Sequence, residues 1–404
     1  MSNEQNLKQE KKSNVLWYYI FAFYIIVSTD SLIVGLNLIP AFHYLSYFIL
    51  IVSGFLLIGA LILRTRGNFS GNGIIGFVLS LFFVALSAVA NVDMSLLAPV
   101  KLGCLMLGFY IANKTNTRLF ITAYIHIMVF LAIVSLIVYA FPNYFLSLDF
   151  FPEIEGYKGQ VFKVFGLANL RVSLLGYRNW GLFWEPGVYQ TYLIIAIVFL
   201  LFDDTYVRRK KTTLTILLIT LVTTFSTTGF LSIPFIILAY ILHKPQKRSR
   251  RGFKFALLIV IAATAVWFVN SDFFELVFSS KFDNLDATGR TLTIEYGLKL
   301  WMKSPIFGFS SDYTQEMYNL AGQSFGITNT FIGNAVAHGA FMGIYSLVAI
   351  IMYAKSYKTK PVVFLLLACG LIFTMSGENY KFSPTICFLM FYRYKSQTIN
   401  VNGE

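Results

Sequence analysis

Long runs of apolar residues alternate with short polar segments along almost the whole chain. A membrane-spanning helix needs about 20 mostly apolar residues, or about 17 at the short end, so this pattern predicts an all-α polytopic membrane protein. We expect one integral-membrane domain (1–404) with tails at 1–14 and 394–404; residues 212–243 fit two spans or one bent helix. About twelve transmembrane helices are expected, at residues 15–36, 43–63, 73–91, 95–113, 119–141, 186–202, 212–226, 228–243, 254–270, 329–354, 361–376 and 383–393.

The composition excludes a soluble protein. Hydrophobic residues make up 57% of the 404 positions and charged residues only 13%, whereas soluble domains carry about 25% charge. The three cysteines, Cys104, Cys369 and Cys387, all lie in apolar runs, which excludes a disulfide framework and a zinc cluster. The sequence contains no motif for a nucleotide cofactor or a bound metal, so we expect neither.

The distribution of basic residues predicts the orientation. If both termini are cytoplasmic, about two thirds of the 32 Lys and Arg residues fall on the cytoplasmic side, as the positive-inside rule requires. The outer segments then carry more acidic than basic side chains. The net charge of +13 therefore follows from membrane topology and requires no nucleic-acid partner.

Two polar segments, residues 142–185 and 271–328, are too long to be simple turns between spans. Loops longer than about 12–15 residues are usually functional or disordered, and the Trp, Tyr, Phe and Gly content of these two argues against disorder. We therefore expect two ordered outer loops that carry the functional site. Residues 291–304 of the second loop have the pattern of an amphipathic helix at the membrane surface, with an apolar face made of Ile294, Leu298, Trp301 and Met302.

Three arginines lie in these outer loops: Arg171, Arg178 and Arg290. A guanidinium is a planar fork of donors that suits a phosphate group, and it stays charged. Arg290 also precedes the expected amphipathic helix, whose first amide groups favour anions. A lone outer arginine more often contacts a headgroup or an acidic side chain, but convergent arginines neutralise a diphosphate without a metal.

Other candidates have both a functional and a structural interpretation. Glu185 is either a general base or an acidic residue that opens the next helix. His338 is either a proton carrier or a structural histidine among small residues. Lys101 and Asp30 are charges inside apolar runs, which are functional by default, although Lys101 can also pair or reach the surface. The residues expected to line the substrate site are Trp184, Tyr189, Trp301 and Glu378.

The segment from Arg178 to Gly187, Arg-Asn-Trp-Gly-Leu-Phe-Trp-Glu-Pro-Gly, leads directly into a span and resembles the Wzy-type polysaccharide polymerases of O-antigen and capsule pathways. Three further features resemble that family: Arg290 with the helix after it, the sequence Ser-Pro-Ile-Phe-Gly at 304–308, and the Ser-Thr-Thr-Gly break at 226–229. The motifs lie mainly in residues 171–310, while the likeness in topology covers the whole chain.

This resemblance implies a fold similar to the multi-span (GT-C-like) glycosyltransferases and an enzyme that needs no metal. Such polymerases work at the outer face of the bacterial plasma membrane. They transfer the growing polysaccharide from one undecaprenyl diphosphate to the non-reducing-end sugar of another lipid-linked unit. The implied partners are lipid-linked oligosaccharides, membrane lipids, a chain-length regulator protein and the flippase of the same pathway.

The resemblance also implies roles for the candidate residues. Arg178 and Arg290 are expected to bind the donor diphosphate, with Arg171 assisting, because the leaving group gains charge in the transition state. Glu185 is the first candidate for the general base that activates the acceptor hydroxyl, and His338 is the second.

Other functions stay open at this point. The related O-antigen ligases have the same layout but present a His, often His-Asn, just before the tenth span, where this chain has Thr328. Another outer-face transferase also fits the layout. A flippase for lipid-linked oligosaccharides usually has short loops and charges on its spans, so the two long aromatic loops favour an enzyme.

Overall fold

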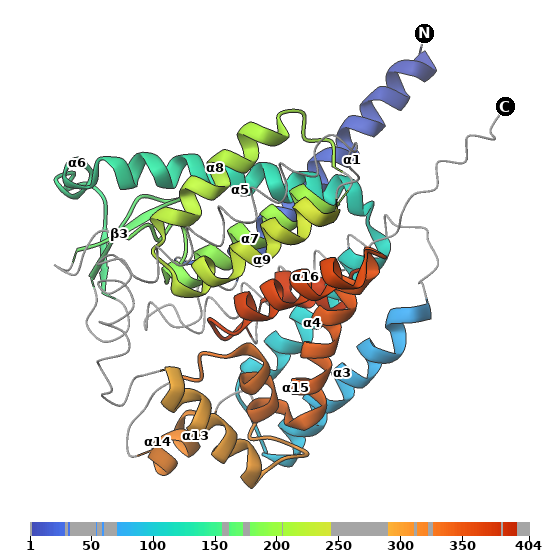
Figure 1. Cartoon of the computed structure of the whole chain (residues 1–404), viewed down its shortest axis with the longest axis vertical. Helices are drawn as coiled ribbons and strands as arrows, with labels where there is room; N and C mark the ends of the chain where they lie inside the picture. The colour runs from blue at the N-terminus through green and yellow to red at the C-terminus, as the bar shows by residue number, and fades with distance from the viewer. Residues whose placement is uncertain are drawn as a thin grey trace.

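Within the described residues, the chain is almost entirely helical (Figure 1), as its apolar pattern predicts. The expected span at 254–270, nearly all of the one at 43–63, the tail at 394–404 and Asp30 lie outside the described residues. The computed structural model describes residues 2–28, 31–32, 54, 59, 71–155, 161–172, 178–203, 205–243, 290–310, 313–321, 326–380 and 383–393.

The first third of the chain forms long helices at the expected spans. Where the polar segment at 115–116 separates two spans, Asn116 caps the second helix, since its side chain accepts a hydrogen bond from the Leu119 amide at 3.3 Å. The helix at the N-terminus extends back through the expected tail. These helices are α1 (Ser2–Val27), α3 (Gly71–Ala90), α4 (Leu97–Lys114) and α5 (Thr117–Ala140).

The described residues of the first long loop contain a small sheet that an all-α prediction misses. After the short helix α6 (Pro142–Leu146), three antiparallel strands pair in the order β1-β2-β3, with Phe162 opposite Arg171. Each strand has three or four residues, too few for a clear period-2 pattern. The strands are β1 (Glu153–Glu155), β2 (Val161–Val164) and β3 (Asn169–Arg171).

Residues 212–243 form two helices and not one bent helix. The chain turns at residues 224–226, between the two helices. Helix α8, before the turn, packs against α5 and α7, and helix α9, after it, packs against α16. The helices of this part are α7 (Pro186–Phe202), α8 (Lys210–Thr223) and α9 (Thr227–His243), and those of the last part are α13 (Arg290–Lys303), α14 (Thr314–Ala321), α15 (Thr330–Ser356), α16 (Pro361–Met375) and α17 (Pro384–Phe391).

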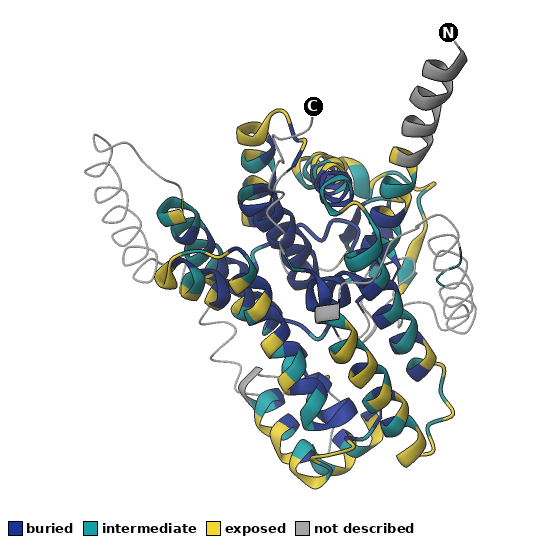
Figure 2. Cartoon of the chain, turned by 90° about the vertical axis from the view of Figure 1, so that its right-hand side faces the viewer, coloured by how far each residue is buried: buried dark blue, intermediate teal, exposed yellow. Residues whose placement is uncertain are grey.

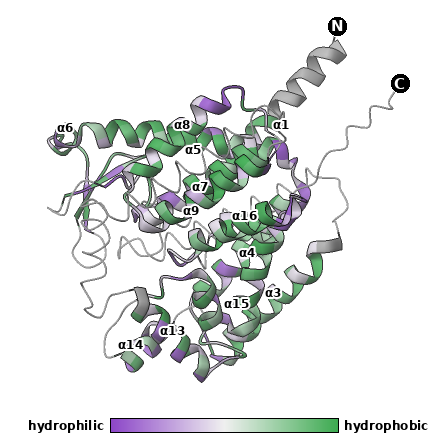
Figure 3. Ribbon diagram, in the orientation of Figure 1, coloured by the Kyte–Doolittle hydropathy of each residue, from purple (hydrophilic) through white to green (hydrophobic). Residues whose placement is uncertain are grey.

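The apolar character of these helices fits an integral membrane protein, and Figure 3 shows apolar residues along most of their length. Among the described helices, three are long and apolar enough to cross a membrane: Gly73–Ala90, Thr117–Ala140 and Thr330–Ser356. The number of twelve spans stays a prediction. Four shorter apolar segments are Val15–Val27, Pro186–Phe202, Thr227–His243 and Pro361–Met375.

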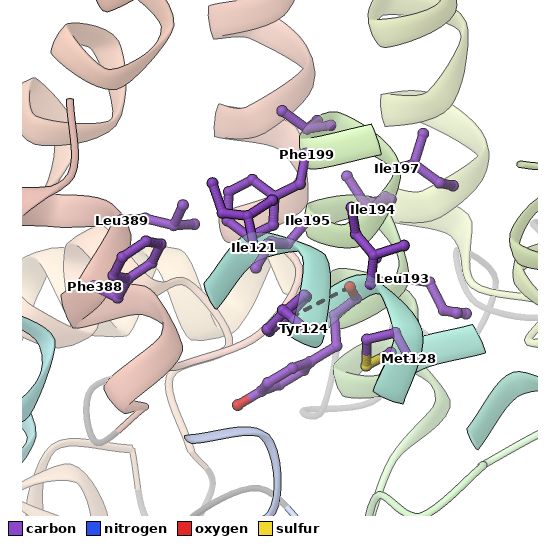
Figure 4. Packing of buried hydrophobic residues seen from close by; sticks show 14 of the residues in the cluster. Ile121, Tyr124, Met128, Leu193, Ile194, Ile195, Ile197, Phe199, Phe388 and Leu389 are labelled. Carbon is purple, nitrogen blue, oxygen red and sulfur yellow. Dashed lines mark hydrogen bonds between the residues drawn. The ribbon is translucent and has the colours of Figure 1, made fainter. Parts of the chain in front are cut away.

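Helix α7 is the centre of the packed core. All of its residues except Leu201 are buried, as expected for a helix that is apolar on every side. Figure 2 shows that buried residues gather on the inner helices. Ile121 and Tyr124 of α5 and Phe388 of α17 pack around α7 (Figure 4), and the Tyr124 hydroxyl donates to the Tyr192 carbonyl at 3.4 Å.

Helices α7, α9, α15 and α17 begin at the same end of the molecule. The segment that joins α16 to α17, residues 376–383, contacts the first turns of α7, α9 and α15. We call this end the loop end. The opposite end, where Asp203 follows α7 and Tyr357 follows α15, is called the tail end.

Candidate active site

The segment 376–380 at the loop end is fixed to two helices by its main chain and by Tyr380. The Thr330 hydroxyl at the start of α15 donates to the Glu378 carbonyl at 2.6 Å and accepts from the Tyr380 amide at 3.1 Å. The Tyr380 hydroxyl lies 3.1 Å from the Gly187 carbonyl oxygen and 2.7 Å from Thr191 Oγ1, both on α7. Position 378 is therefore held rigidly beside the start of α7.

Glu378 is buried at the loop end, with only 4% of its surface exposed. Its carboxylate lies directly against Gly187, where an added Cβ would be 2.2 Å from Oε1. The sequence predicts that Glu378 lines the substrate site, and the structure buries it beside α7. Gly187, the glycine of the Glu-Pro-Gly motif, is thus the position that leaves room for this carboxylate.

A second polar group, Gln190, lies one turn further into α7. Its Nε2 is 3.1 Å from both Thr191 Oγ1 and Thr228 Oγ1. Its Oε1 is buried, has no hydrogen-bond partner among the described residues, and faces Gly229. Sequence reasoning missed Gln190, and the available signal was an amide side chain within an otherwise apolar span.

Arg178 lies at the end of α8, where it contacts main-chain carbonyls. Its Nε donates to the Thr224 carbonyl and its Nη2 to the Phe225 carbonyl, both at 3.0 Å. A cation at a helix C-terminus is favourable because the last carbonyls there lack amide partners. These two contacts fix the guanidinium at the end of α8.

The other candidates from the first loop lie on or near its small sheet. Arg171 ends β3, and its guanidinium carbon is 6.0 Å from the centre of the Trp180 ring. Trp184 is half-buried against the cluster that contains Trp180. Tyr189 is fully buried, with its hydroxyl 2.9 Å from Ser135 Oγ and its ring beneath Gly181.

Glu185 is the residue immediately before α7. Its backbone is extended, and its carbonyl accepts hydrogen bonds from the Val188 and Tyr189 amides at 3.1 Å. Its side chain is half-buried. Glu185 therefore opens α7, the helix that Glu378 contacts. This position fits both interpretations of Glu185, as a helix start and as a site residue.

Helix α13 (Arg290–Lys303) lies where the amphipathic helix is expected, and Arg290 is its first residue. The Thr293 hydroxyl is 3.0 Å from the Thr328 hydroxyl, so the first turn of α13 lies beside the start of α15. The buried face of α13 carries Thr293, Gly297 and Leu300, and not the expected apolar residues. Leu298 and Met302 are 41% and 63% exposed. Trp301 lies near the C-terminal end, where its Nε1 donates to the Pro305 carbonyl at 3.2 Å.

His338 marks a break within α15 that the sequence analysis did not predict. His338 and Gly339 have non-helical backbone angles, with φ of +82° at Gly339. The segment 304–309 enters this break: the Phe309 amide donates to the Val336 carbonyl at 2.8 Å, and the Ala340 amide to the Pro305 carbonyl at 2.7 Å. The Ser-Pro-Ile-Phe-Gly motif thus satisfies the main-chain groups that the break exposes. His338 itself is fully buried.

Lys101, the charge expected within a span, is buried inside the protein. Its Nζ donates to Asn334 Oδ1 at 3.2 Å, which links α4 to the first part of α15. Only 1% of its surface is exposed, so this lysine does not reach the membrane surface. It pairs within the protein, one of the two alternatives that the sequence leaves open.

The site residues come from several elements that meet at the loop end. Helices α7, α9 and α15 begin there, and helix N-termini favour anions. The Asn329 side chain already caps the Phe331 and Ile332 amides of α15. Within the described residues, no three His, Cys, Asp or Glu side chains come together as a metal site needs. The arrangement suits binding of an anion by arginines and amide groups beside a buried carboxylate.

Residues 212–342 match the family described as O-Antigen ligase (Wzy_C), over about a third of the chain. Over this segment the chain is similar to the O-antigen ligase family. Members of that family are membrane enzymes that transfer glycosyl groups and act on lipid-linked oligosaccharides. No curated protein and no solved structure matches the chain.

The O-antigen ligase family segment contributes three parts of the loop end. It contains the carbonyl groups that Arg178 contacts, the helix α13 that begins with Arg290, and the first half of α15 up to its break. The Glu-Pro-Gly motif before α7 and the segment 376–380 lie outside the matched residues. The family match and the site geometry therefore meet at the loop end.

Proposed function

We propose that this protein is a polysaccharide polymerase that joins oligosaccharide repeat units carried on undecaprenyl diphosphate. The growing chain leaves one lipid diphosphate and passes to the non-reducing-end sugar of a new lipid-linked unit. The loop end faces the outside of the bacterial plasma membrane, with both termini in the cytoplasm. The product is an O-antigen, a capsule or an exopolysaccharide, and a chain-length regulator and the flippase of the pathway work with the enzyme.

One observation carries the choice of polymerase over ligase. Ligases of this family present a histidine just before the tenth span, and the residue in that place is Thr328. Its hydroxyl pairs with Thr293 of α13 at 3.0 Å, so the position serves to join two helices through uncharged groups. A hydroxyl group with a pKa far above 7 does not exchange protons as an imidazole does.

The donor site of the proposed reaction is built from arginines. Arg178 and Arg290 hold the diphosphate, with Arg171 assisting, and no metal is needed. This proposal is supported by the contact of Arg178 with the turn that leads into α9 and by the position of Arg290 at the start of α13. Charge that develops on the leaving diphosphate is stabilised by donors already in place before the reaction. Trp184, Tyr189 and Trp301 are proposed as aromatic residues around the sugar substrate.

Deletion of the gene, followed by gel analysis of the surface glycan, tests the proposed reaction. A polymerase deletion leaves material with a single repeat unit. Polymer that accumulates on the carrier lipid indicates a ligase, and the absence of any exported repeat unit indicates a flippase. Complementation with the intact gene restores the ladder and serves as the control.

A further inference from the structure

Two carboxylates, Glu185 and Glu378, lie near the start of α7, and the structure holds them differently. Glu185 is half-buried. Glu378 is 4% exposed, and its main chain is fixed by Thr330 of α15. A general base must be held at a fixed place relative to the hydroxyl that it deprotonates, and Glu378 meets this condition better.

Gly187 leaves room for the Glu378 carboxylate beside α7. A Cβ on Gly187 would lie 2.2 Å from Oε1, 3.0 Å from Cδ and 3.2 Å from Cγ of Glu378. Any other residue at position 187 would therefore displace the carboxylate. The Tyr380 hydroxyl also reaches the Gly187 carbonyl at 3.1 Å, so α7 and the segment 376–380 together fix where the carboxylate lies.

A second, independent feature at this place calls for a hydroxyl or water donor. Gln190 lies three residues after Gly187, on the same side of α7, and its Oε1 has no hydrogen-bond partner among the described residues although it is fully buried. A buried acceptor without a donor costs about 1–3 kcal/mol. This oxygen faces Gly229 of α9, next to Thr228, against which Gly377 packs.

From these contacts we infer that Glu378, and not Glu185 or His338, is the carboxylate that deprotonates the acceptor sugar. The inference rests on the proposed glycosyl transfer. The acceptor hydroxyl oxygen forms a bond to the anomeric carbon of the donor while its proton passes to the Glu378 carboxylate. The bond between that carbon and the phosphate oxygen breaks, its electron pair leaves with the lipid diphosphate, and Glu378 later releases the proton to water. Gly187, Thr330 and Tyr380 are positioning residues.

Substitution of each carboxylate by its amide separates the two candidates. The assay uses the purified full chain in proteoliposomes with lipid-linked repeat units extracted from the deletion strain. Glu378→Gln keeps the shape of the side chain, and we expect kcat to fall about 10²–10⁴-fold with KM unchanged, as for loss of a general base. Glu185→Gln is the comparison and is expected to lose less activity, and Glu153→Gln, at an exposed position of β1, is the matched control with unchanged activity. Wild-type kcat in Glu378→Gln, or the larger loss in Glu185→Gln, overturns the inference.

A double-mutant cycle tests the contact with Gly187 and does not depend on the folding of Glu378→Gln. Gly187→Ala pushes the carboxylate away, and Glu378→Asp withdraws it by one methylene group. We expect each to lower kcat about 10²-fold, since small misplacements have effects of that size. The double variant loses about as much as Glu378→Asp alone, and less than the product of the two single losses, because the shorter side chain accommodates the added methyl group. Additive losses contradict the inference.

Gly103→Ala is the control for adding a methyl group to a helix, because nothing lies within 4 Å of a Cβ at that position in α4. Failure of the proposed function is distinguishable from failure of the inference. If the wild-type protein transfers glycan to lipid A-core without lengthening it, the polymerase proposal is wrong. The amide variants still report on Glu378 in that case, since the same bond changes require a base.

Discussion

The two ends of the molecule each bury a carboxylate, and they use it in different ways. At the tail end, both oxygens of Asp203 accept hydrogen bonds: Tyr357 donates to Oδ2 at 2.5 Å and Tyr392 to Oδ1 at 2.6 Å. At the loop end, the main chain of Glu378 is bonded to Thr330 while its carboxylate faces the backbone of Gly187. Two phenol groups that enclose a carboxylate join the ends of three helices, whereas a carboxylate beside a glycine is placed at a helix start.

This difference predicts that changes at the loop end lower the rate of transfer and that changes at the tail end lower stability. The tail-end group is remote from the motifs, since Asp203 follows α7 and Tyr392 follows α17. The loop end gathers Arg178, the start of α13 and the segment 376–380. At the tail end, two phenol hydroxyls satisfy both oxygens of Asp203, and a satisfied buried polar group of this kind makes the structure more rigid.

The largest effect is expected for the arginines proposed to bind the diphosphate. Arg178→Ala lowers kcat about 10²–10³-fold, as loss of one donor to a developing anion does, and Arg290→Ala has a similar effect. The measurement is the transfer rate in proteoliposomes. Arg208→Ala, at an exposed position before α8, is the control with an unchanged rate. Normal transfer rates for both Arg178→Ala and Arg290→Ala would show that these arginines do not bind the diphosphate.

Gly339→Ala is expected to lower stability although it lies near the loop end. The φ of +82° is unfavourable for alanine, and the Cβ would lie 1.8 Å from the Ile306 carbonyl oxygen. We expect a loss of about 3 kcal/mol, at the upper end for a strained backbone position, seen as a lower unfolding temperature in detergent. Gly103→Ala is the control. An unchanged unfolding temperature would show that segment 304–309 does not hold the break in α15.

Asp203→Asn tests the structural role of the buried carboxylate at the tail end. The amide group cannot accept both phenol hydrogen bonds, so one buried hydroxyl loses its acceptor at a cost of about 1–3 kcal/mol. We expect a lower unfolding temperature and an unchanged transfer rate for the folded protein. Tyr392→Phe removes one donor from the same group and gives a smaller decrease. A rate that falls while the unfolding temperature stays constant would contradict a purely structural role of Asp203.

Much of the fold follows from the sequence. The amphipathic helix expected at 291–304 is α13, because a 3.6-residue pattern and Pro305 define it locally. The short strands of the first loop were missed because they depend on pairing between segments. The break at Gly339 was missed because residues 304–309, thirty positions away, complete it.

The candidate site likewise contains residues that the sequence predicts and residues that it does not. Motif residues such as Arg178 and Glu185 were found from local sequence, and the structure places them at the loop end. Gln190 was missed, and so was the contact between Gly187 and Glu378, which joins residues nearly two hundred positions apart. Such contacts have no local pattern, since they depend on how α7 packs against the segment before α17.

The smallest effect is expected on the exposed side of α13. Lys299 Nζ lies 2.6 Å from Glu295 Oε1, and this hydrogen bond, together with the charge of Glu295, raises the pKa of Lys299 above its ordinary value of 10.5. A raised lysine pKa contributes stability below the ordinary value that is lost as the pH rises through the raised one. Because the pair is exposed, Lys299→Met leaves the unfolding temperature unchanged at pH 7–9. A clear decrease at pH 8 would mean that α13 depends on this ion pair.

The most direct test of the central claim is the product that the purified protein makes. Wild-type protein in proteoliposomes receives only undecaprenyl-diphosphate-linked repeat units, and the products are separated by gel electrophoresis. We expect a ladder of polymers that grows by one repeat unit per step, without added metal or nucleotide sugar. Repeat units that stay single under these conditions, and that are transferred once lipid A-core is added, would contradict it.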